Sequence, residues 1–107
     1  LNFTKKQSPL QEKCEKQCEA WSKSYQQKYP SDKLTFENHY NQRLNKCFML
    51  VTYSTSRMKS LKSISENKIY GSLLVKQNSK TLICNVLENK CKTEKEWDAL
   101  VKPYMEE

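Results

Sequence analysis

The chain has 107 residues, of which 36% are hydrophobic and 29% charged, and it contains one Gly, three Pro and five Cys. This length supports one domain with a modest core, and the polar composition excludes a fibrous or intrinsically disordered protein. The longest apolar run, residues 47–51, is too short to cross a bilayer. The net charge of +7 favours an acidic protein, a nucleic acid or an anionic membrane as partner.

The excess positive charge lies in the middle of the chain, because residues 38–89 contain eight basic residues and two acidic ones. Seventeen of the 19 basic residues are Lys, which lacks the planar fork with which Arg binds phosphates and base edges. We therefore expect an acidic protein surface as the partner. A module that binds an anionic ligand or a nucleic acid is the alternative, and a solvated surface without a partner has the same charge pattern.

Residues 1–7 show no periodic pattern, and we expect a flexible arm there, followed by a single disulfide-stabilised domain over residues 8–107. Ser8, Pro9 and Gln11 have the spacing of a helix N-terminus, with a cap, a first-turn proline and a capping-box residue. The predicted helix ends at Tyr29, before Pro30. Five residues at helical spacing share its expected buried face: Leu10, Cys14, Cys18, Trp21 and Tyr25.

Three antiparallel strands are expected next. Residues 44–53 contain an apolar run of strand-forming types, typical of a central strand that is buried on both sides. Residues 69–76 and 81–87 form a predicted hairpin around the polar connection 77–80. The Ser- and Lys-rich segment 54–67 is expected to be a loop.

A second capping box, Thr93 to Glu96, predicts a final helix with an apolar stripe that Pro103 kinks or ends. The stripe consists of Trp97, Leu100, Val101 and Tyr104. The predicted fold is therefore α+β, with an N-terminal helix, a three-stranded antiparallel sheet and a C-terminal helix. Both helices are expected on one face of the sheet.

The five cysteines indicate an exported protein, because thiols pair and persist in an oxidising compartment. Cys84 and Cys91 flank a tight reversal and are expected to bond each other. Cys14 and Cys18 lie four residues apart on a helix, so their side chains are parallel and one of them is expected to bond Cys47. One thiol stays unpaired. The start at Leu1 fits the removal of an export signal or a trimmed chain.

The cysteines and the histidine allow two chemical alternatives. A zinc site would use Cys14 and Cys18, but the spacing of Cys84 and Cys91 is too wide for a second pair of ligands, so no metal is expected. A thiol-dependent enzyme would need a reactive cysteine near His39, the only histidine, and no cysteine has a local catalytic context. We expect no cofactor and no enzymatic activity.

Four segments resemble a group of small bacterial proteins that often carry an export or lipoprotein signal: HYNQRLNKCF (39–48), ENKIYG (66–71), Cys84-Asn85-Val86 to Cys91, and EWDALVKPYM (96–105). The similarity covers most of residues 14–105, and the HYNxxLNKC-like element is its most specific part. This group usually has one cysteine at the place of Cys14 and a small residue at the place of Cys18. The resemblance therefore implies a Cys14–Cys47 bridge with Cys18 free, and it carries no assigned activity.

The expected function is that of a non-enzymatic exported bacterial domain, periplasmic or tethered to a membrane, that binds another protein. An inhibitor, an immunity protein or a component of an envelope complex would fit. The expected contact residues lie in a polar stretch before the central strand: His39, Tyr40, Asn41 and Arg43. Alternatively, Tyr40 and Asn41 cover the sheet edge through local hydrogen bonds.

Overall fold

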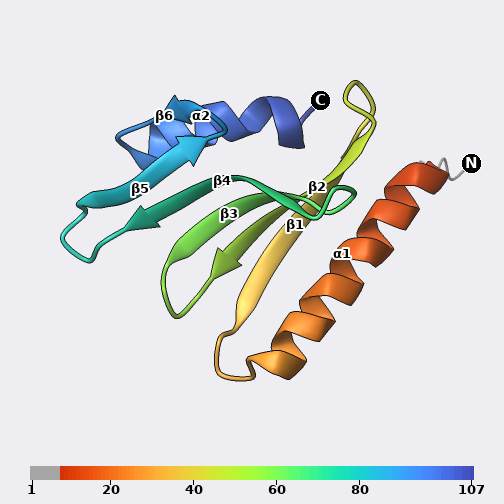
Figure 1. The fold of residues 1–107 in the computed structure, drawn as a ribbon, viewed down its shortest axis with the longest axis horizontal. Coiled ribbons are helices and arrows are strands. Elements are labelled where there is room, and N and C mark those ends of the chain that lie inside the picture. The colour runs from red at the N-terminus through yellow and green to blue at the C-terminus, as the bar shows by residue number, and fades with distance from the viewer. Residues whose placement is uncertain (1–7) are drawn as a thin grey trace, which may run out of the picture.

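The computed structural model describes residues 8–107 and shows an α+β fold in which two helices flank one six-stranded sheet (Figure 1). The α+β class and both terminal helices are confirmed, whereas the prediction of three strands is wrong. The arm expected over residues 1–7 lies outside the described residues. The elements are α1 (Pro9–Lys28), β1 (Leu34–Asn41), β2 (Lys46–Tyr53), β3 (Met58–Ser63), β4 (Lys68–Val75), β5 (Thr81–Val86), β6 (Asn89–Lys90) and α2 (Glu94–Met105).

The sheet is an antiparallel meander, in which each strand pairs with the next along the chain, from β1 to β6. Residues that are partners across neighbouring strands point to the same face. Phe36 pairs with Val51, Val51 with Ser60 and Ser60 with Ser72, and this row marks one face across four strands. The register shifts at Leu61/Lys62 and at Leu74/Val75, where the ladder contains irregularities.

The sequence does not predict three of the six strands. β1 lies in the polar stretch before the central strand, and β6 has two residues in the turn expected between Glu88 and Lys90. β3 lies within the expected loop 54–67, where Met58, Leu61 and Ile64 have a misleading helical spacing. Leu61 is fully buried in β3, between β2 and β4, so partners on both sides decide its conformation.

Each of the five connections between successive strands contains one residue with a positive φ angle, and none of these residues is glycine. They are Asn45, Arg57, Asn67, Ser79 and Leu87, with φ between 52° and 66°. The left-handed region is uncommon for most side chains, and Asn tolerates it best. The single glycine, Gly71, lies in β4, where an added Cβ would approach the Asn85 carbonyl oxygen to 2.5 Å.

The two helices cover opposite faces of the sheet, so the prediction that they share one face is wrong. Alternate residues of β2 show this arrangement. Cys47, Met49 and Val51 pack with α1, whereas Phe48 belongs to the core beneath α2, together with Trp97. β2 is buried on both faces, as its apolar run predicts, but it is not central, because it is second in the strand order, next to the edge strand β1.

Two glutamines of α1 cover the outer edge of β1. Gln11 accepts a hydrogen bond from the Tyr40 amide at 2.7 Å and donates one to Asn38 Oδ1 at 2.9 Å. Gln26 accepts from the Leu34 amide at 3.4 Å, near the other end of the strand. Unpaired strand edges invite association with other chains, and these side chains occupy backbone groups that would otherwise stay open. Leu10, expected on the buried face, is instead 50% exposed.

The buried Asn41 ties the end of β1 to the end of α2. Its side-chain Nδ2 donates to the carbonyl oxygens of Pro103 and Tyr104, at 3.0 and 3.2 Å, and its Oδ1 accepts from the Leu44 amide at 2.9 Å. The last carbonyls of a helix lack partners within the helix, so Asn41 satisfies two of them. Pro103 lies inside α2, which continues past it to Met105.

Replacement of Asn41 by Asp tests this tie, because a carboxylate has no hydrogen to donate and faces the negative end of the helix dipole. We expect the free energy of unfolding to fall by about 2 kcal/mol or more, as for a buried polar group without its partner. Urea denaturation measures this change. The control is Asn78→Asp, because Asn78 lies in a turn and uses only its side-chain oxygen, to accept from the Lys80 amide. Equal midpoints for the two variants would contradict the role of Asn41.

Candidate functional site

Two disulfides are present, Cys14–Cys47 and Cys84–Cys91. The first joins α1 to β2, with a Cα–Cα distance of 5.3 Å, and is the pairing that the family resemblance implies. The second closes the reversal that contains β6, as expected from the sequence. Disulfides persist in oxidising compartments, so both bridges fit an extracellular type of environment.

The fifth cysteine, Cys18, is a free thiol with no exposed surface. Its Sγ lies 3.7 Å from Cys47 Sγ, next to the first bridge. Burial, with a smaller contribution from Glu19, raises the pKa of the Cys18 thiol from 9.0 to about 12. The thiolate is the nucleophilic form of cysteine, so Cys18 is a poor nucleophile at neutral pH. This environment does not activate a cysteine for catalysis.

The three sulfurs of Cys14, Cys18 and Cys47 lie within 4.8 Å of one another, the spacing that a bound metal ion requires. Metal ligation needs thiolates, however, and two of these sulfurs already share a covalent bond. In the oxidised protein, only Cys18 of this group has a thiol to offer. With the Cys14–Cys47 bridge formed, the group consists of one disulfide and one thiol.

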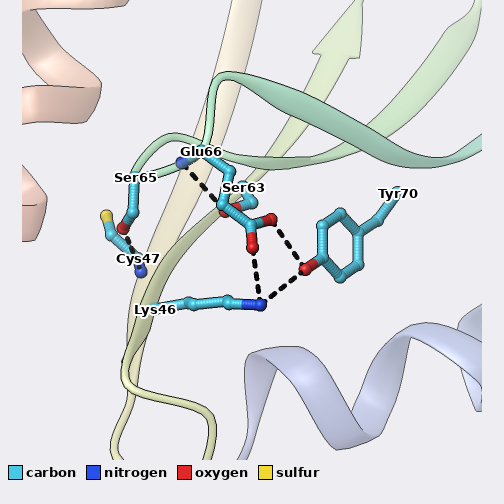
Figure 2. Close-up of polar contacts among 6 residues, drawn as sticks. All are labelled: Lys46, Cys47, Ser63, Ser65, Glu66 and Tyr70. Carbon is cyan, nitrogen blue, oxygen red and sulfur yellow. Dashed lines mark hydrogen bonds and ion pairs between the residues drawn. The ribbon is translucent and has the colours of Figure 1, made fainter.

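A polar triangle of Lys46, Glu66 and Tyr70 connects the start of β2 to the turn between β3 and β4 (Figure 2). Lys46 forms an ion pair with Glu66 and donates to the Tyr70 hydroxyl at 3.2 Å, and that hydroxyl donates to Glu66 at 2.8 Å. The Tyr70 ring is buried against Phe48 and Tyr104. The triangle therefore joins surface charges to the core.

The charges of this triangle are stabilised rather than poised for proton transfer. Hydrogen bonds from Lys46 and Tyr70 lower the pKa of Glu66, and the hydrogen bond to Glu66 raises the pKa of Lys46. Burial raises the pKa of Tyr70, which keeps its proton. A general acid or base works best with a pKa near the operating pH, and all three shifts move away from neutrality. The triangle therefore has a structural role, in which it connects β2 with β4 and with the turn between β3 and β4.

The four contact residues predicted from the sequence lie at the end of β1 and in the following turn, but they do not form one surface. Asn41 is fully buried by its contacts with α2. Tyr40 pairs with Cys47 on the face of α1 and donates to Asn45, whereas His39 pairs with Phe48 on the opposite face. Arg43 is exposed and forms an ion pair with Glu107. Partner contacts by His39, Tyr40 and Arg43 stay a prediction.

Within residues 8–107, part of the sheet face that carries α1 has no covering helix. α1 packs mainly on β1 and β2, and Figure 1 shows β4 and β5 lying away from it. On this face, Met58, Leu74 and Ile83 are partners across β3, β4 and β5, and we call them the apolar row. Ile83 is 39% exposed, and the other two are half-buried. Uncovered apolar side chains that lie together on a folded surface are typical of interaction sites.

Three exposed basic residues lie in the turns beside the apolar row. Arg57 directly precedes Met58, and Lys76 and Lys80 flank the turn between β4 and β5. Because Met58 pairs with Leu74, these two turns lie at the same end of the sheet (Figure 1). Arg43, Lys46 and Lys59 form ion pairs, whereas Arg57, Lys76 and Lys80 form none within residues 8–107. We call these three residues the basic end.

The sequence does not predict the apolar row, because it does not place Met58 in a strand beside Leu74. Met58 lies in the segment 54–67 that is expected to be a loop, so the sequence does not identify it as the cross-strand partner of Leu74. The three residues of the basic end belong to the basic segment 38–89 that the charge pattern identifies.

Over residues 8–107, no helix combines the length and hydrophobicity needed to cross a membrane.

Cysteine alkylation under three conditions checks the assignment of the bridges. We expect iodoacetamide to label one cysteine when the chain unfolds in its presence without reductant, and all five after reduction. In the native protein at pH 7, Cys18 should stay unlabelled for minutes, because it is buried and protonated. Intact mass and peptide mapping measure each state. Two or more labels without reductant would contradict the two bridges, and rapid native labelling of Cys18 would contradict its burial.

The polar triangle predicts a pH dependence of stability. Since the pKa of Glu66 is lower in the folded chain, its contribution is present above the ordinary value of 4.5 and is lost as the pH falls through the folded pKa. We expect Glu66→Gln to melt at a lower temperature than the wild type at pH 7, and this difference to vanish in acid. Calorimetry with Glu88→Gln as control measures it. A difference between wild type and Glu66→Gln that persists unchanged in acid would argue against this assignment.

Comparisons of the chain with protein families, with curated proteins and with solved structures found no match. The group of bacterial proteins that the HYNxxLNKC-like element resembles therefore stays a prediction.

Proposed function

We propose that the protein is a non-enzymatic protein-binding domain that docks an acidic, partly apolar segment of its partner on the apolar row. The observation that carries this proposal is the uncovered sheet face over β3 to β5, where Met58, Leu74 and Ile83 lie beside unpaired basic residues. Burial of such a row on binding removes apolar surface from water, at about 25 cal/mol per Å². This gain supplies affinity without a deep pocket.

The basic end supports an acidic partner over a neutral one. Arg57, Lys76 and Lys80 have no ion-pair partner in the described chain, so their charges are available to another molecule. Complementary charges at the rim of an interface speed association and select among partners. A segment with apolar residues for the row and carboxylates for the basic end fits both features.

The site of action is proposed to be the bacterial envelope. The two disulfides support an exported protein, and the family resemblance adds a bacterial, periplasmic or membrane-tethered setting. An inhibitor, an immunity protein or a component of an envelope complex would use such a docking surface. His39, Tyr40 and Arg43 are proposed as further contacts at the opposite end of the sheet.

A displayed library of random peptides, selected on the immobilised wild-type protein, tests the proposal. We expect the selected peptides to be rich in Asp, Glu and apolar residues and to bind Ile83→Glu at least tenfold more weakly. Leu10→Glu is the matched control, because Leu10 is exposed on α1, outside the apolar row. Lys80→Glu and Lys95→Glu form a second pair, since both lysines are exposed but only Lys80 belongs to the basic end. Circular dichroism verifies that each variant is folded.

Three results would oppose the proposal: no selected peptide, peptides without acidic residues, or equal binding to Ile83→Glu and Leu10→Glu. Competition with duplex and single-stranded DNA separates the alternative of a nucleic-acid module. DNA that binds tightly at low salt, loses affinity steeply with added salt and displaces the peptides would favour that alternative.

A further inference from the structure

We propose that Cys14, Cys18 and Cys47 form a thiol–disulfide exchange site, in which Cys18 displaces Cys14 from Cys47 and leaves Cys14 as a thiol beside a surface pocket, where small disulfides can modify it. The proposal is independent of the protein-binding function. The supporting observation is the position of Cys18. Its Sγ is 3.7 Å from Cys47 Sγ, and the sulfurs of Cys14, Cys18 and Cys47 all lie within 4.8 Å of one another.

The helix presents both of its cysteines to the same strand residue. Residues four apart on a helix lie on one face, with Cβ atoms about 5–6 Å apart, so Cys14 and Cys18 both face Cys47. The backbone of Cys47 is held in place, because its amide donates to Ser65 Oγ at 2.9 Å (Figure 2). Attack on a disulfide runs in line with the bond that breaks, whereas the three sulfurs form a bent arrangement, because all of them lie within 4.8 Å of one another. The side chains of Cys18 and Cys47 must therefore turn before Cys47 changes its partner.

The exchange needs no external oxidant or reductant. The Cys18 thiolate attacks Cys47 Sγ, the Cys18–Cys47 bond forms, the Cys14–Cys47 bond breaks, and Cys14 leaves as a thiolate. The proton lost by Cys18 is regained, through solvent, by Cys14. One disulfide and one thiol are present before and after the step. Because Cys18 is protonated at neutral pH, the exchange is slow.

All three cysteines are buried before exchange, with Cys14 1%, Cys18 0% and Cys47 2% exposed, but they differ in their position relative to a surface pocket. The Cys14–Cys47 bridge lines a surface pocket together with Leu10, Lys13, Gln17 and Tyr40, and Cys18 does not line this pocket. Exchange therefore moves the free thiol from the buried position 18 to position 14 at the pocket. There, the Cys14 thiolate can attack a small disulfide, forming a mixed disulfide and releasing one thiol. The ammonium of Lys13 beside the pocket suits an anionic disulfide.

Long alkylation of the native protein without reductant tests the proposal. We incubate the oxidised wild type with iodoacetamide for days at mildly alkaline pH, digest it without reduction, and map labels and bridges by mass spectrometry. We expect one label per chain on Cys14, together with a Cys18–Cys47 bridge. In Cys18→Ser, which keeps the original bridge but has no attacking thiol, the label on Cys14 should be at least tenfold lower.

Two outcomes of this incubation would overturn the proposal: wild-type label only on Cys18, or no label on Cys14. Label on Cys84 or Cys91 would also overturn it, because it would show that bridges rearrange in the unfolded chain. The same incubation with oxidised glutathione should produce a mixed disulfide at Cys14 in the wild type and none in Cys18→Ser.

The variant Cys14→Ser tests the geometry separately. We expect it to fold under oxidising conditions with a Cys18–Cys47 bridge, so that the native and the unfolded non-reduced chain both take up no iodoacetamide. Folded Cys14→Ser protein in which Cys18 and Cys47 both remain thiols would show that the two sulfurs cannot bond in this fold. If this variant does not fold, the comparison of wild type with Cys18→Ser still decides the question.

Discussion

The bond between Cys14 and Cys47 is the constraint on which the arrangement of this protein depends. It joins α1 to β2 across a sequence separation of 33 residues. In the chain-entropy account, closing a loop of this size stabilises the fold by about 3 to 4 kcal/mol, a large share of the stability of a small domain. With α1 held there, Gln11 and Gln26 reach the backbone of β1, and one edge of the sheet is covered.

The same bond determines which part of the sheet stays open. A single helix cannot cover six strands, and the bridge places α1 over β1 and β2. The apolar row of Met58, Leu74 and Ile83 therefore remains uncovered on that face, while α2 packs on the other. Arg43, Lys46 and Lys59 form ion pairs with glutamates of the same chain. Within residues 8–107, the three residues of the basic end form no ion pair, so their positive charges stay available beside the row. The proposed docking surface thus results from the position of α1.

The turns explain why half of the strands escaped the sequence analysis. Strand connections are usually recognised by Gly, Asn-Gly or Pro signals. Here the single glycine lies within β4, and the left-handed positions of the five connections are occupied by other residues, among them Arg57 and Leu87. Without these signals, β3 resembles a Ser- and Lys-rich loop. The prediction of contact residues failed at Asn41 for a related reason. Asn41 is buried by α2, which lies more than 60 residues further along the chain.

The sequence by itself determined the α+β class, both terminal helices with their caps, the strand that is buried on both faces and the reversal closed by Cys84 and Cys91. These features follow from local periodicity, capping residues and short-range spacing, which a linear chain contains. Only the tertiary structure decided the number of strands, the opposite placement of the helices, the uncovered face and the position of Cys18 beside Cys47. The missed strands depend on pairing with the neighbouring strands of the meander, and the other three features depend on contacts between segments far apart in the chain. Such contacts are selected by packing rather than by local propensity.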